Sequence, residues 1–386
     1  MNGLMKRSSV AGSPTADDSG GTRGDEAPAQ SSSGRVSPVE SYLTGGGFSG
    51  RHVLTVDDFT KPMLHDLFEL TDYYRMCVLT GEKLDHVLKV RSLLCGRCHG
   101  SLFYEVSTRT SCSFSAACQR LGGAVVSIDS HSVQKGECLE DTVRVMAGYS
   151  DVLVLRHPET GAAERAALAS SKPLINAGDG TGRHPTQALL DVYTIRQELG
   201  TVSNLTIAMV GDLKHGRTVH SLARLLCVYS GLTCNYMSPT GLEMPIDVKE
   251  FVDRHSIRQR EFVTLAEALD DADVVYHYGE YPSVPSEIPE GADGVLVTRV
   301  PRMRFPSREE YDRCREAMVV TPELLNETRR SVLSRGARPV VMHPLPRLEE
   351  ISQELDADPR AAYFRQAQNG LYVRMALLAL LLNRRH

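Results

Sequence analysis

The stretch Leu102-Phe103-Tyr104-Glu105, followed by Ser107-Thr108-Arg109-Thr110 and Ser111-Cys112-Ser113-Phe114, decides the fold of this chain. It is typical of a strand that leads into the start of a helix. Apolar residues then recur on one helical face, and Gly122-Gly123 ends the helix. A helix N-terminus offers unpaired N–H groups and a positive dipole end, so these hydroxyls and guanidinium predict a phosphate site. A polar helix cap with a solvated arginine is the alternative.

Short β-branched runs alternate with helical patterns along the chain, which predicts parallel sheets joined by crossover helices. The paired runs are 124–128 with 139–147, 152–155 with 162–169, and 205–210 with 218–226; further strands are expected over 273–276, 294–298 and 339–342. In open sheets of this kind, ligands collect beyond the carboxyl ends of the strands. The expected fold is therefore α/β, with two doubly wound domains, each a central parallel sheet flanked by helices.

Length and composition fit an ordinary globular protein. The 386 residues exceed what one hydrophobic core usually serves, and 41% hydrophobic content is enough to fill two. A net charge of −5 creates no field that would gather nucleic acid or an anionic membrane. The apolar run 377–382 is too short to span a bilayer and predicts a buried C-terminal helix. We expect neither a nucleic-acid partner nor membrane insertion.

Nine cysteines without a visible secretory leader predict reduced thiols in a cytoplasmic protein. Cys95-Gly96-Arg97-Cys98-His99 matches the spacing of a c-type haem attachment site, and its cysteine pair could also be half of a zinc site or a redox pair. Haem attachment needs export, and zinc needs a second ligand pair that the sequence does not offer nearby. We therefore interpret this run as strand and turn residues.

Two segments are expected to lie outside the packed cores. Residues 1–40 are rich in Ser, Gly, Ala, Pro and Asp and predict a disordered tail. Residues 277–294 are rich in Pro, Gly and acidic residues and predict a surface excursion between strands.

Two further motifs supply polar groups at expected strand ends. Arg156-His157-Pro158 follows the strand 152–155 and places a cation there, although a solvated arginine would look the same. Asn176 to Gly180 form a Gly-rich loop that leads to His184-Pro185-Thr186-Gln187. His184 and Gln187 stand one turn apart at a helix start, where both could face a ligand.

The second half of the chain carries cations at similar positions. The turn 211–218 lacks G-x-G-x-x-G, so a dinucleotide site is disfavoured. Arg217 opposes the dipole of the helix that it opens, which suggests a negative partner, either a ligand carboxylate or a salt bridge to Glu105. Arg299 follows the strand 294–298. His343-Pro344-Leu345-Pro346-Arg347 follows the strand 339–342, and its carbonyls could accept from an amine.

In combination these motifs resemble the catalytic chains of the aspartate carbamoyltransferase family, from about residue 50 to the C-terminus. The motifs that carry the resemblance, in family order, are Ser107 to Thr110, Arg156 to Pro158, His184 to Gln187, Gly211 to Lys214, Thr298-Arg299 and His343 to Arg347. The resemblance implies transfer of a carbamoyl group from carbamoyl phosphate to L-aspartate in pyrimidine biosynthesis, without a metal or organic cofactor. It also implies a carbamoyl-phosphate-binding domain over 41–184 plus 370–386 and an aspartate-binding domain over 185–369.

The resemblance implies a role for each matching residue. It assigns the phosphate to Ser107, Thr108, Arg109 and Thr110. It assigns the carbamoyl carbonyl to Thr110, Arg156 and His184, and the carbamoyl amide to Gln187. The aspartate carboxylates are assigned to Arg217 and Arg299, and the amines to the carbonyls of Pro344 and Leu345. The Leu345–Pro346 bond is expected to be cis. Ser132 and Lys135 would reach a neighbouring subunit's carbamoyl phosphate, and Lys135 also its aspartate. This sharing implies a homotrimer.

The sequence departs from the family at two places. Pro301 stands where the family usually has a Gln that contacts aspartate, and the excursion before Arg299 is longer than in bacterial members. Other functions that the motifs leave open are a carbamoyltransferase for another amino acid such as ornithine, a non-catalytic scaffold derived from the fold, and a dinucleotide oxidoreductase.

Overall fold

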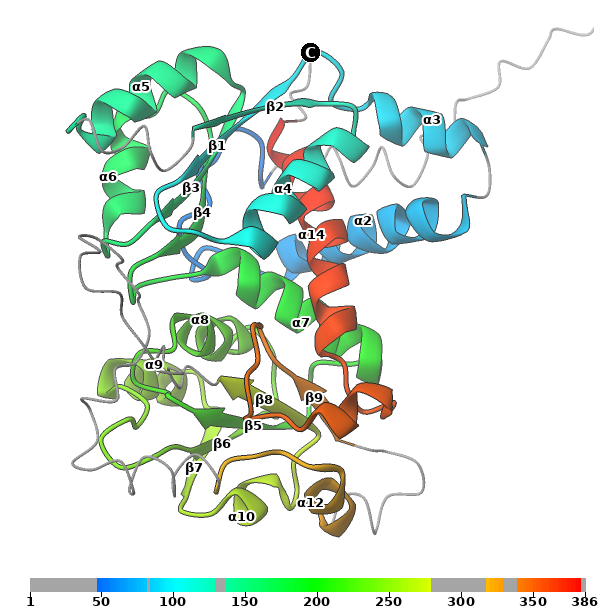
Figure 1. Cartoon of the computed structure of the whole chain (residues 1–386), viewed down its shortest axis with the longest axis vertical. Helices are drawn as coiled ribbons and strands as arrows, with labels where there is room; N and C mark the ends of the chain where they lie inside the picture. The colour runs from blue at the N-terminus through cyan, green and yellow to red at the C-terminus, as the bar shows by residue number, and fades with distance from the viewer. Residues whose placement is uncertain (1–46, 82–83, 129–135, 279–316, 329–338, 383–386) are drawn as a thin grey trace, which may run out of the picture. The chain divides into compact units, whose positions relative to one another are not determined.

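The computed structural model describes residues 47–81, 84–128, 136–278, 317–328 and 339–382, which contain two parallel β-sheets (Figure 1). The expected tail 1–40 and the expected strand 294–298 lie outside the described residues. The alternation of strands and crossover helices that the sequence predicts is confirmed, and the fold is α/β.

The first sheet has four parallel strands in the order β2-β1-β3-β4. They are β1 (Cys98–Phe103), β2 (Ala124–Ile128), β3 (Val152–His157) and β4 (Leu174–Asp179). Three helices connect them: α4 (Thr108–Arg120), α5 (Leu139–Tyr149) and α6 (Ala162–Ala169). The strand order reverses between β1 and β3, so a ligand crevice is expected beyond the carboxyl ends of these two strands.

Both faces of the first sheet are covered by helices (Figure 1). Val152 and Val154 share a buried cluster with Phe114 of α4, whereas Leu153 and Leu155 share a separate cluster with Val143 of α5. Alternate residues of a strand point to opposite faces of a sheet. A strand that is apolar at every position is therefore buried on both sides, as expected for a parallel sheet.

The second sheet has five parallel strands in the order β7-β6-β5-β8-β9. They are β5 (Thr206–Gly211), β6 (Thr233–Met237), β7 (Arg258–Phe262), β8 (Val274–Tyr278) and β9 (Val340–Met342). The accompanying helices are α8 (Arg217–Leu226), α9 (Ile246–Arg254), α10 (Leu265–Leu269) and α12 (Pro322–Glu327). Here the order reverses between β5 and β8, and the loop after β5 leads to Arg217 at the start of α8.

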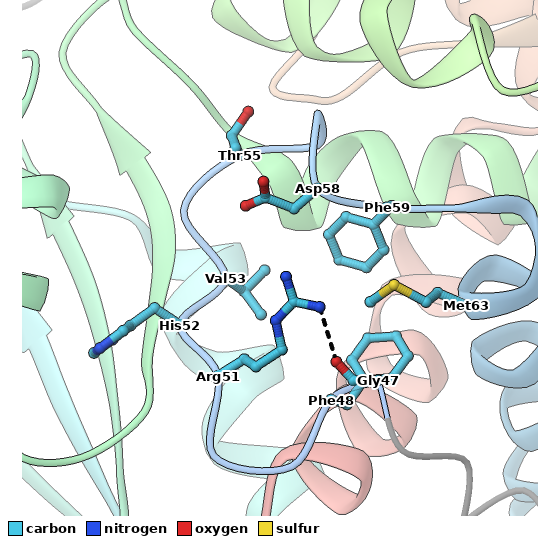
Figure 2. Close-up of a pocket in the computed structure, with 9 residues that line it drawn as sticks. All are labelled: Gly47, Phe48, Arg51, His52, Val53, Thr55, Asp58, Phe59 and Met63. Carbon is cyan, nitrogen blue, oxygen red and sulfur yellow. Dashed lines mark hydrogen bonds between the residues drawn. The ribbon is translucent and has the colours of Figure 1, made fainter.

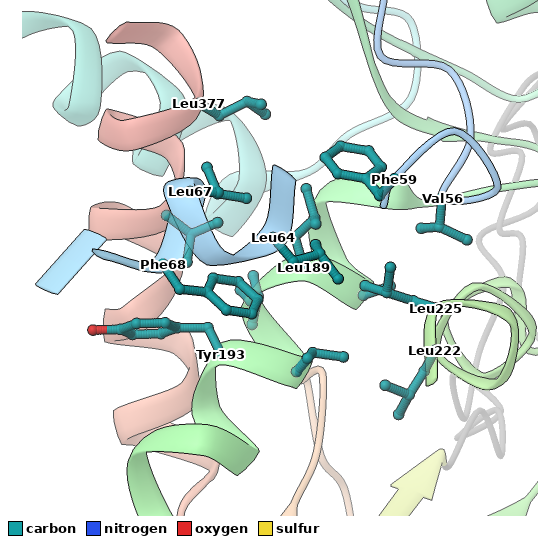
Figure 3. Close-up of a cluster of buried hydrophobic side chains, with 14 of the residues drawn as sticks. Val56, Phe59, Leu64, Leu67, Phe68, Leu189, Tyr193, Leu222, Leu225 and Leu377 are labelled. Atoms are coloured by element: carbon teal, nitrogen blue, oxygen red, sulfur yellow. The ribbon is translucent and has the colours of Figure 1, made fainter. Parts of the chain in front are cut away.

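Helices α2 (Lys61–Thr80) and α7 (Pro185–Leu199) pack against the C-terminal helix α14 (Tyr363–Leu382), which also contacts α4. Figure 3 shows leucines of α2, α7, α8 and α14 in one buried cluster. The residues from Tyr372 to Leu382 are all buried, as expected for a helix that is apolar on every side. The buried C-terminal helix that the run 377–382 predicts is thus confirmed. The two smaller elements are α3 (Leu84–Ser92) and η3 (Gln353–Ala357).

Four boundaries expected from the sequence are wrong. Arg156 and His157, expected after the strand 152–155, are the last residues of β3. Tyr104 and Glu105, expected to end a strand, lie beyond the end of β1 at Phe103. Asn176 to Asp179, expected in a Gly-rich loop, are the end of β4, because this stretch is completely buried beside β3 and keeps its strand pairing across a bulge. His277 and Tyr278, expected to open the excursion, are buried residues of β8. The rest of the excursion lies outside the described residues.

The cysteine-rich run 95–99 consists of turn and strand residues, as interpreted from the sequence. Cys95 lies in a turn, and Cys98 and His99 open β1. Within the described ranges, no cluster of three or more His, Cys, Asp or Glu side chains is arranged to hold a metal ion. None of the helices described there is long and apolar enough to cross a membrane.

His99 is a buried ionisable residue in β1. Its ring lies 6.1 Å from the ring of Phe114, and neither ring nitrogen has a hydrogen-bond partner among the described residues. Burial lowers the pKa of His99 to about 4. The unfolded chain should bind a proton on this ring near pH 6.5, whereas the folded chain should not.

We predict that His99→Leu weakens the acid sensitivity of folding. The pKa of His99 is lower in the folded chain than in the unfolded chain, so the unfolded chain binds a proton there more strongly. The free energy of unfolding therefore has its full value above pH 6.5 and decreases as the pH falls. Between pH 7 and pH 5, protonation of His99 should lower the free energy of unfolding of the wild type by about 2 kcal/mol. His99→Leu should not show this decrease. Urea unfolding at both pH values measures it, with exposed His255→Asn as control. An unchanged pH dependence in His99→Leu would contradict the prediction.

Candidate active site

The predicted phosphate site lies at the N-terminus of α4, directly after β1. Ser107 is the N-cap residue, and its hydroxyl makes no capping hydrogen bond. Thr108 and Arg109 are exposed, whereas Thr110 is buried. Partial burial lowers the pKa of Arg109. The first N–H groups of the helix have no intrahelical acceptor, so this end can bind an anion with backbone and side-chain donors together.

Glu105 holds two of the predicted site arginines. Arg156 donates to its carboxylate with Nε at 3.2 Å and Nη2 at 3.0 Å, and Arg217 Nη2 lies 3.4 Å from Oε2. Burial alone would raise the pKa of Glu105, but Arg217 and Arg156 lower it below its ordinary value. The salt bridge from Arg217 to Glu105 considered from the sequence is therefore confirmed. It joins the end of β1 to the start of α8.

The two arginines and His184 converge on Gly178 in β4. A methyl group at Gly178 would lie 3.3 Å from Cζ of Arg217, 3.4 Å from Cδ2 of His184 and 3.5 Å from Nη1 of Arg156. The φ angle of Gly178 is 116°, a conformation that other residues rarely adopt. Asn176 accepts the Gly178 N–H at 2.8 Å and so supports this conformation. The glycine leaves room at the point where three predicted site side chains meet.

His184 is the N-cap residue of α7 and is almost completely buried. Its N–H donates to Ser221 Oγ of α8 at 3.0 Å, while Nδ1 has no hydrogen-bond partner among the described residues. Burial, and then the nearby charges of Arg156, Arg217 and Arg374, lower its pKa well below the ordinary value. His184 is therefore neutral at pH 7, and one of its nitrogens carries a proton that it can donate to a ligand.

Gln187 lies in the first turn of α7, as its spacing from His184 predicts. Its side chain is buried, and Nε2 donates to Asp191 Oδ1 at 2.8 Å. Sequence reasoning missed Asp191, because an acidic residue in the middle of an apolar helix gives no sign of its partners.

The turn 343–347 follows β9, and the Leu345–Pro346 bond is cis, as expected. Leu345 has a φ of 60°, and its N–H donates to His343 Nδ1 at 2.8 Å. Nε2 of His343 lies 3.0 Å from Oε1 of Glu350. Since Nδ1 accepts a hydrogen bond, Nε2 carries the proton and faces the carboxylate. His343 therefore fixes the backbone from which the carbonyls of Pro344 and Leu345 project.

Five residues singled out in the sequence lie outside the described residues: Ser132, Lys135, Thr298, Arg299 and Pro301. Figure 2 shows a separate pocket near residue 47, lined by Phe48, Phe59 and Met63 among others. Arg51 at its edge donates to the carbonyl of Gly47 at 3.1 Å. None of the predicted site residues that the structure describes lines this pocket.

Comparisons with known proteins agree with this architecture. Residues 51–197 match the family model described as "Aspartate/ornithine carbamoyltransferase, carbamoyl-P binding domain", and residues 203–279 and 280–381 match the one described as "Aspartate/ornithine carbamoyltransferase, Asp/Orn binding domain". The chain belongs to the aspartate/ornithine carbamoyltransferase family.

The relatives include proteins named as multifunctional and proteins named as aspartate carbamoyltransferases. The chain is 50% identical over 339 residues to multifunctional protein CAD of Squalus acanthias, covering 87% of this chain but only 14% of that protein's length. It is 46% identical over 335 residues to the chloroplastic aspartate carbamoyltransferase of Oryza sativa subsp. japonica, covering 86% of this chain and 84% of the relative. The chain thus spans a small part of the multifunctional relative and most of the plant one.

Solved structures of aspartate transcarbamoylases share the fold. The Trypanosoma cruzi protein in complex with carbamoyl aspartate and phosphate is 37% identical with a TM-score of 0.71, covering 87% of this chain and 97% of that one. The catalytic subunit from M. jannaschii is 37% identical with a TM-score of 0.72, covering 86% and 98%.

We predict that Gly178→Ala lowers the free energy of unfolding by about 3 kcal/mol, because a methyl group adds backbone strain and crowds the side chains of Arg217 and His184. Gly200, which ends α7 with a φ of 72° and open space around it, provides a matched control. Gly200→Ala should cost only about 1 kcal/mol, from backbone strain alone. Equal losses in urea unfolding would contradict the convergence of side chains on Gly178.

Proposed function

We propose that the chain transfers the carbamoyl group of carbamoyl phosphate to the amine of L-aspartate, giving N-carbamoyl-L-aspartate and phosphate for pyrimidine biosynthesis. The observation that carries the proposal is the convergence of Arg156, His184 and Arg217 on Gly178. The Trypanosoma cruzi relative in complex with carbamoyl phosphate and aspartate, at 35% identity, supports the choice of substrates.

The carbamoyl phosphate half of the proposed site uses fixed donors. Ser107, Thr108, Arg109 and Thr110, with the first N–H groups of α4, bind the phosphate, which leaves into the same donors. Thr110, Arg156 and neutral His184 donate to the carbamoyl oxygen, which gains negative charge in the tetrahedral intermediate. These three side chains are already buried or half-buried and oriented, so little reorganisation opposes the reaction.

The acceptor half of the proposed site positions aspartate. Arg217 and Arg299 bind its two carboxylates, and the carbonyls of Pro344 and Leu345 accept hydrogen bonds from the amines of both substrates. The amine attacks in its unprotonated form, and the departing phosphate can take up its proton. No group in this scheme requires a metal or organic cofactor.

The proposed domains follow the two sheets. Residues 41–184 with 370–386 form the carbamoyl-phosphate-binding domain, and residues 185–369 form the aspartate-binding domain. Support comes from α14, whose C-terminal part returns to pack on α2 and α4. The salt bridge between Glu105 and Arg217 would then join the two substrate-binding halves.

A homotrimer with shared sites is the proposed assembly, in which Ser132 and Lys135 reach a neighbouring subunit. Val145 and Tyr149 of α5 and Leu168 of α6 support it, because they are exposed apolar side chains on two helices in contact. We also place the protein in the cytoplasm, since all described cysteines are free thiols. Because the rice relative is named chloroplastic, imaging of a tagged full chain is the test.

The function is tested by incubating the purified chain with carbamoyl phosphate and either L-aspartate or L-ornithine. We expect N-carbamoyl-L-aspartate and no citrulline, which chromatography with mass detection distinguishes. Citrulline would reassign the acceptor, and absence of both products would favour a non-catalytic scaffold.

We predict that Arg156→Ala and His184→Ala each lower kcat by roughly 10²–10³-fold, the usual effect of losing one donor to a developing oxyanion. Steady-state kinetics at saturating substrates measure it. Arg365→Ala is the matched control, because this arginine pairs with Glu198 at the surface. Near-normal turnover in both site variants would show that other groups polarise the carbonyl.

The shared site is tested by mixing two inactive variants. His184→Ala damages a subunit's own site, whereas Lys135→Ala damages the site of its neighbour. After dissociation and reassembly together, mixed trimers should regain partial activity, because some sites then contain both residues. Light scattering of the same samples reports the oligomeric state. No recovery in reassembled trimers would contradict the shared site.

A further inference from the structure

Asp191 lies in the middle of α7 and is completely buried. Its carboxylate accepts three hydrogen bonds from three different elements. Oδ1 accepts from Nε2 of Gln187 at 2.8 Å and from Nε2 of Gln366 in α14 at 2.6 Å. Oδ2 accepts from the hydroxyl of Tyr276 in β8 at 2.9 Å. One carboxylate thus joins α7, α14 and the second sheet.

The carboxylate sets the direction of both glutamine amides. An ionised carboxylate only accepts hydrogen bonds, so each glutamine must turn its NH2 group toward Asp191. The carbonyl oxygen of each glutamine is then left for another partner. In Gln366 this oxygen accepts the backbone N–H of His343 at 2.9 Å. In Gln187 the corresponding oxygen is the atom left for a ligand.

The groups around Asp191 offset part of the free-energy cost of burying its charged carboxylate. Burial raises the pKa of Asp191 to about 7, while the bonds from Gln366, Tyr276 and Gln187 and the charge of Arg374 favour the ionised form. Arg374 is itself buried in α14, and its pKa is lowered to about 10 by burial although Asp191 raises it. At pH 8 the carboxylate is mainly ionised and a buried guanidinium balances it.

We propose that Asp191 is a positioning residue for the transfer reaction: it holds the Gln187 amide with its carbonyl oxygen toward the NH2 of the carbamoyl group and, through Gln366, anchors the backbone at His343. The inference rests on the proposed function. An amide in the opposite orientation would present NH2 to NH2, and a binding site loses affinity when a ligand donor faces no acceptor. Asp191 therefore acts on the carbamoyl group without touching it.

The test compares Asp191→Leu with Asp191→Asn at pH 8. Leucine is similar in size but offers no acceptor, so the Gln187 amide is no longer held; the KM for carbamoyl phosphate should rise by ~10-fold or more. The inhibition constant of inorganic phosphate should change by less than ~2-fold, because phosphate binds at Ser107 to Thr110. Asparagine keeps one oxygen for the NH2 groups of Gln187 and Gln366 and can turn its own NH2 toward the hydroxyl of Tyr276, which can accept. Asp191→Asn should therefore keep most of the carbamoyl phosphate affinity.

Tyr276→Phe is the matched control, because it removes one hydrogen bond to the same carboxylate without turning an amide. It should lower the melting temperature but leave the KM for carbamoyl phosphate unchanged. An unchanged KM in Asp191→Leu, or an Asp191→Asn variant as impaired as Asp191→Leu, would overturn the inference. If Asp191→Leu fails to fold, Asp191→Val, which is smaller and likewise offers no acceptor, takes its place in the comparison. A wild-type chain that carbamoylates neither amino acid would instead refute the proposed function.

Discussion

The bidentate salt bridge between Glu105 and Arg156, with Arg217 on the same carboxylate, is the interaction on which the candidate site depends. Two guanidiniums with side chains only 12% exposed would repel each other without a shared anion. Breaking a buried ion pair by removing one partner leaves an uncompensated charge. Glu105 therefore allows the two guanidiniums to lie beside Gly178 before any substrate is present. Their positive charges in turn lower the pKa of Glu105 although its burial would raise it.

The topology explains why these groups meet. In both sheets the strand order reverses next to the strand that leads to a site motif: β1 leads to Ser107 at the start of α4, and β5 leads to Arg217 at the start of α8. Helix α7 starts at His184, and its core contains Asp191, which connects Gln187 to α14 and β8. Arg156 is held at the end of β3, Arg217 at the start of α8, and the amides of Gln187 and Gln366 in buried helices. Regular elements thus position these side chains.

Much of this arrangement could be predicted from the sequence, because strand–helix alternation and helix starts are local signals. The pattern located α6 and the helix starts at His184 and Arg217, and it suggested Glu105 as a partner of Arg217. It placed Arg156 one residue beyond a strand, whereas Arg156 lies inside β3. It missed β4, β6 and β7. The sequence of β7, Arg258–Phe262, is largely polar, and this strand lies at a sheet edge. It also missed Gly178 as a meeting point and the bond between Asp191 and Gln366. These depend on contacts between residues up to 175 positions apart, for which one sequence gives no signal.

The most direct test of the account is a crystal structure of the full chain with carbamoyl phosphate bound. The account predicts the phosphate at the N-terminus of α4, bonded to Ser107 to Thr110, with the carbamoyl oxygen facing Arg156 and His184 and the carbamoyl nitrogen facing the oxygen of Gln187. Carbamoyl phosphate bound away from Gly178, or an Arg156 that contacts neither the ligand nor Glu105, would contradict it.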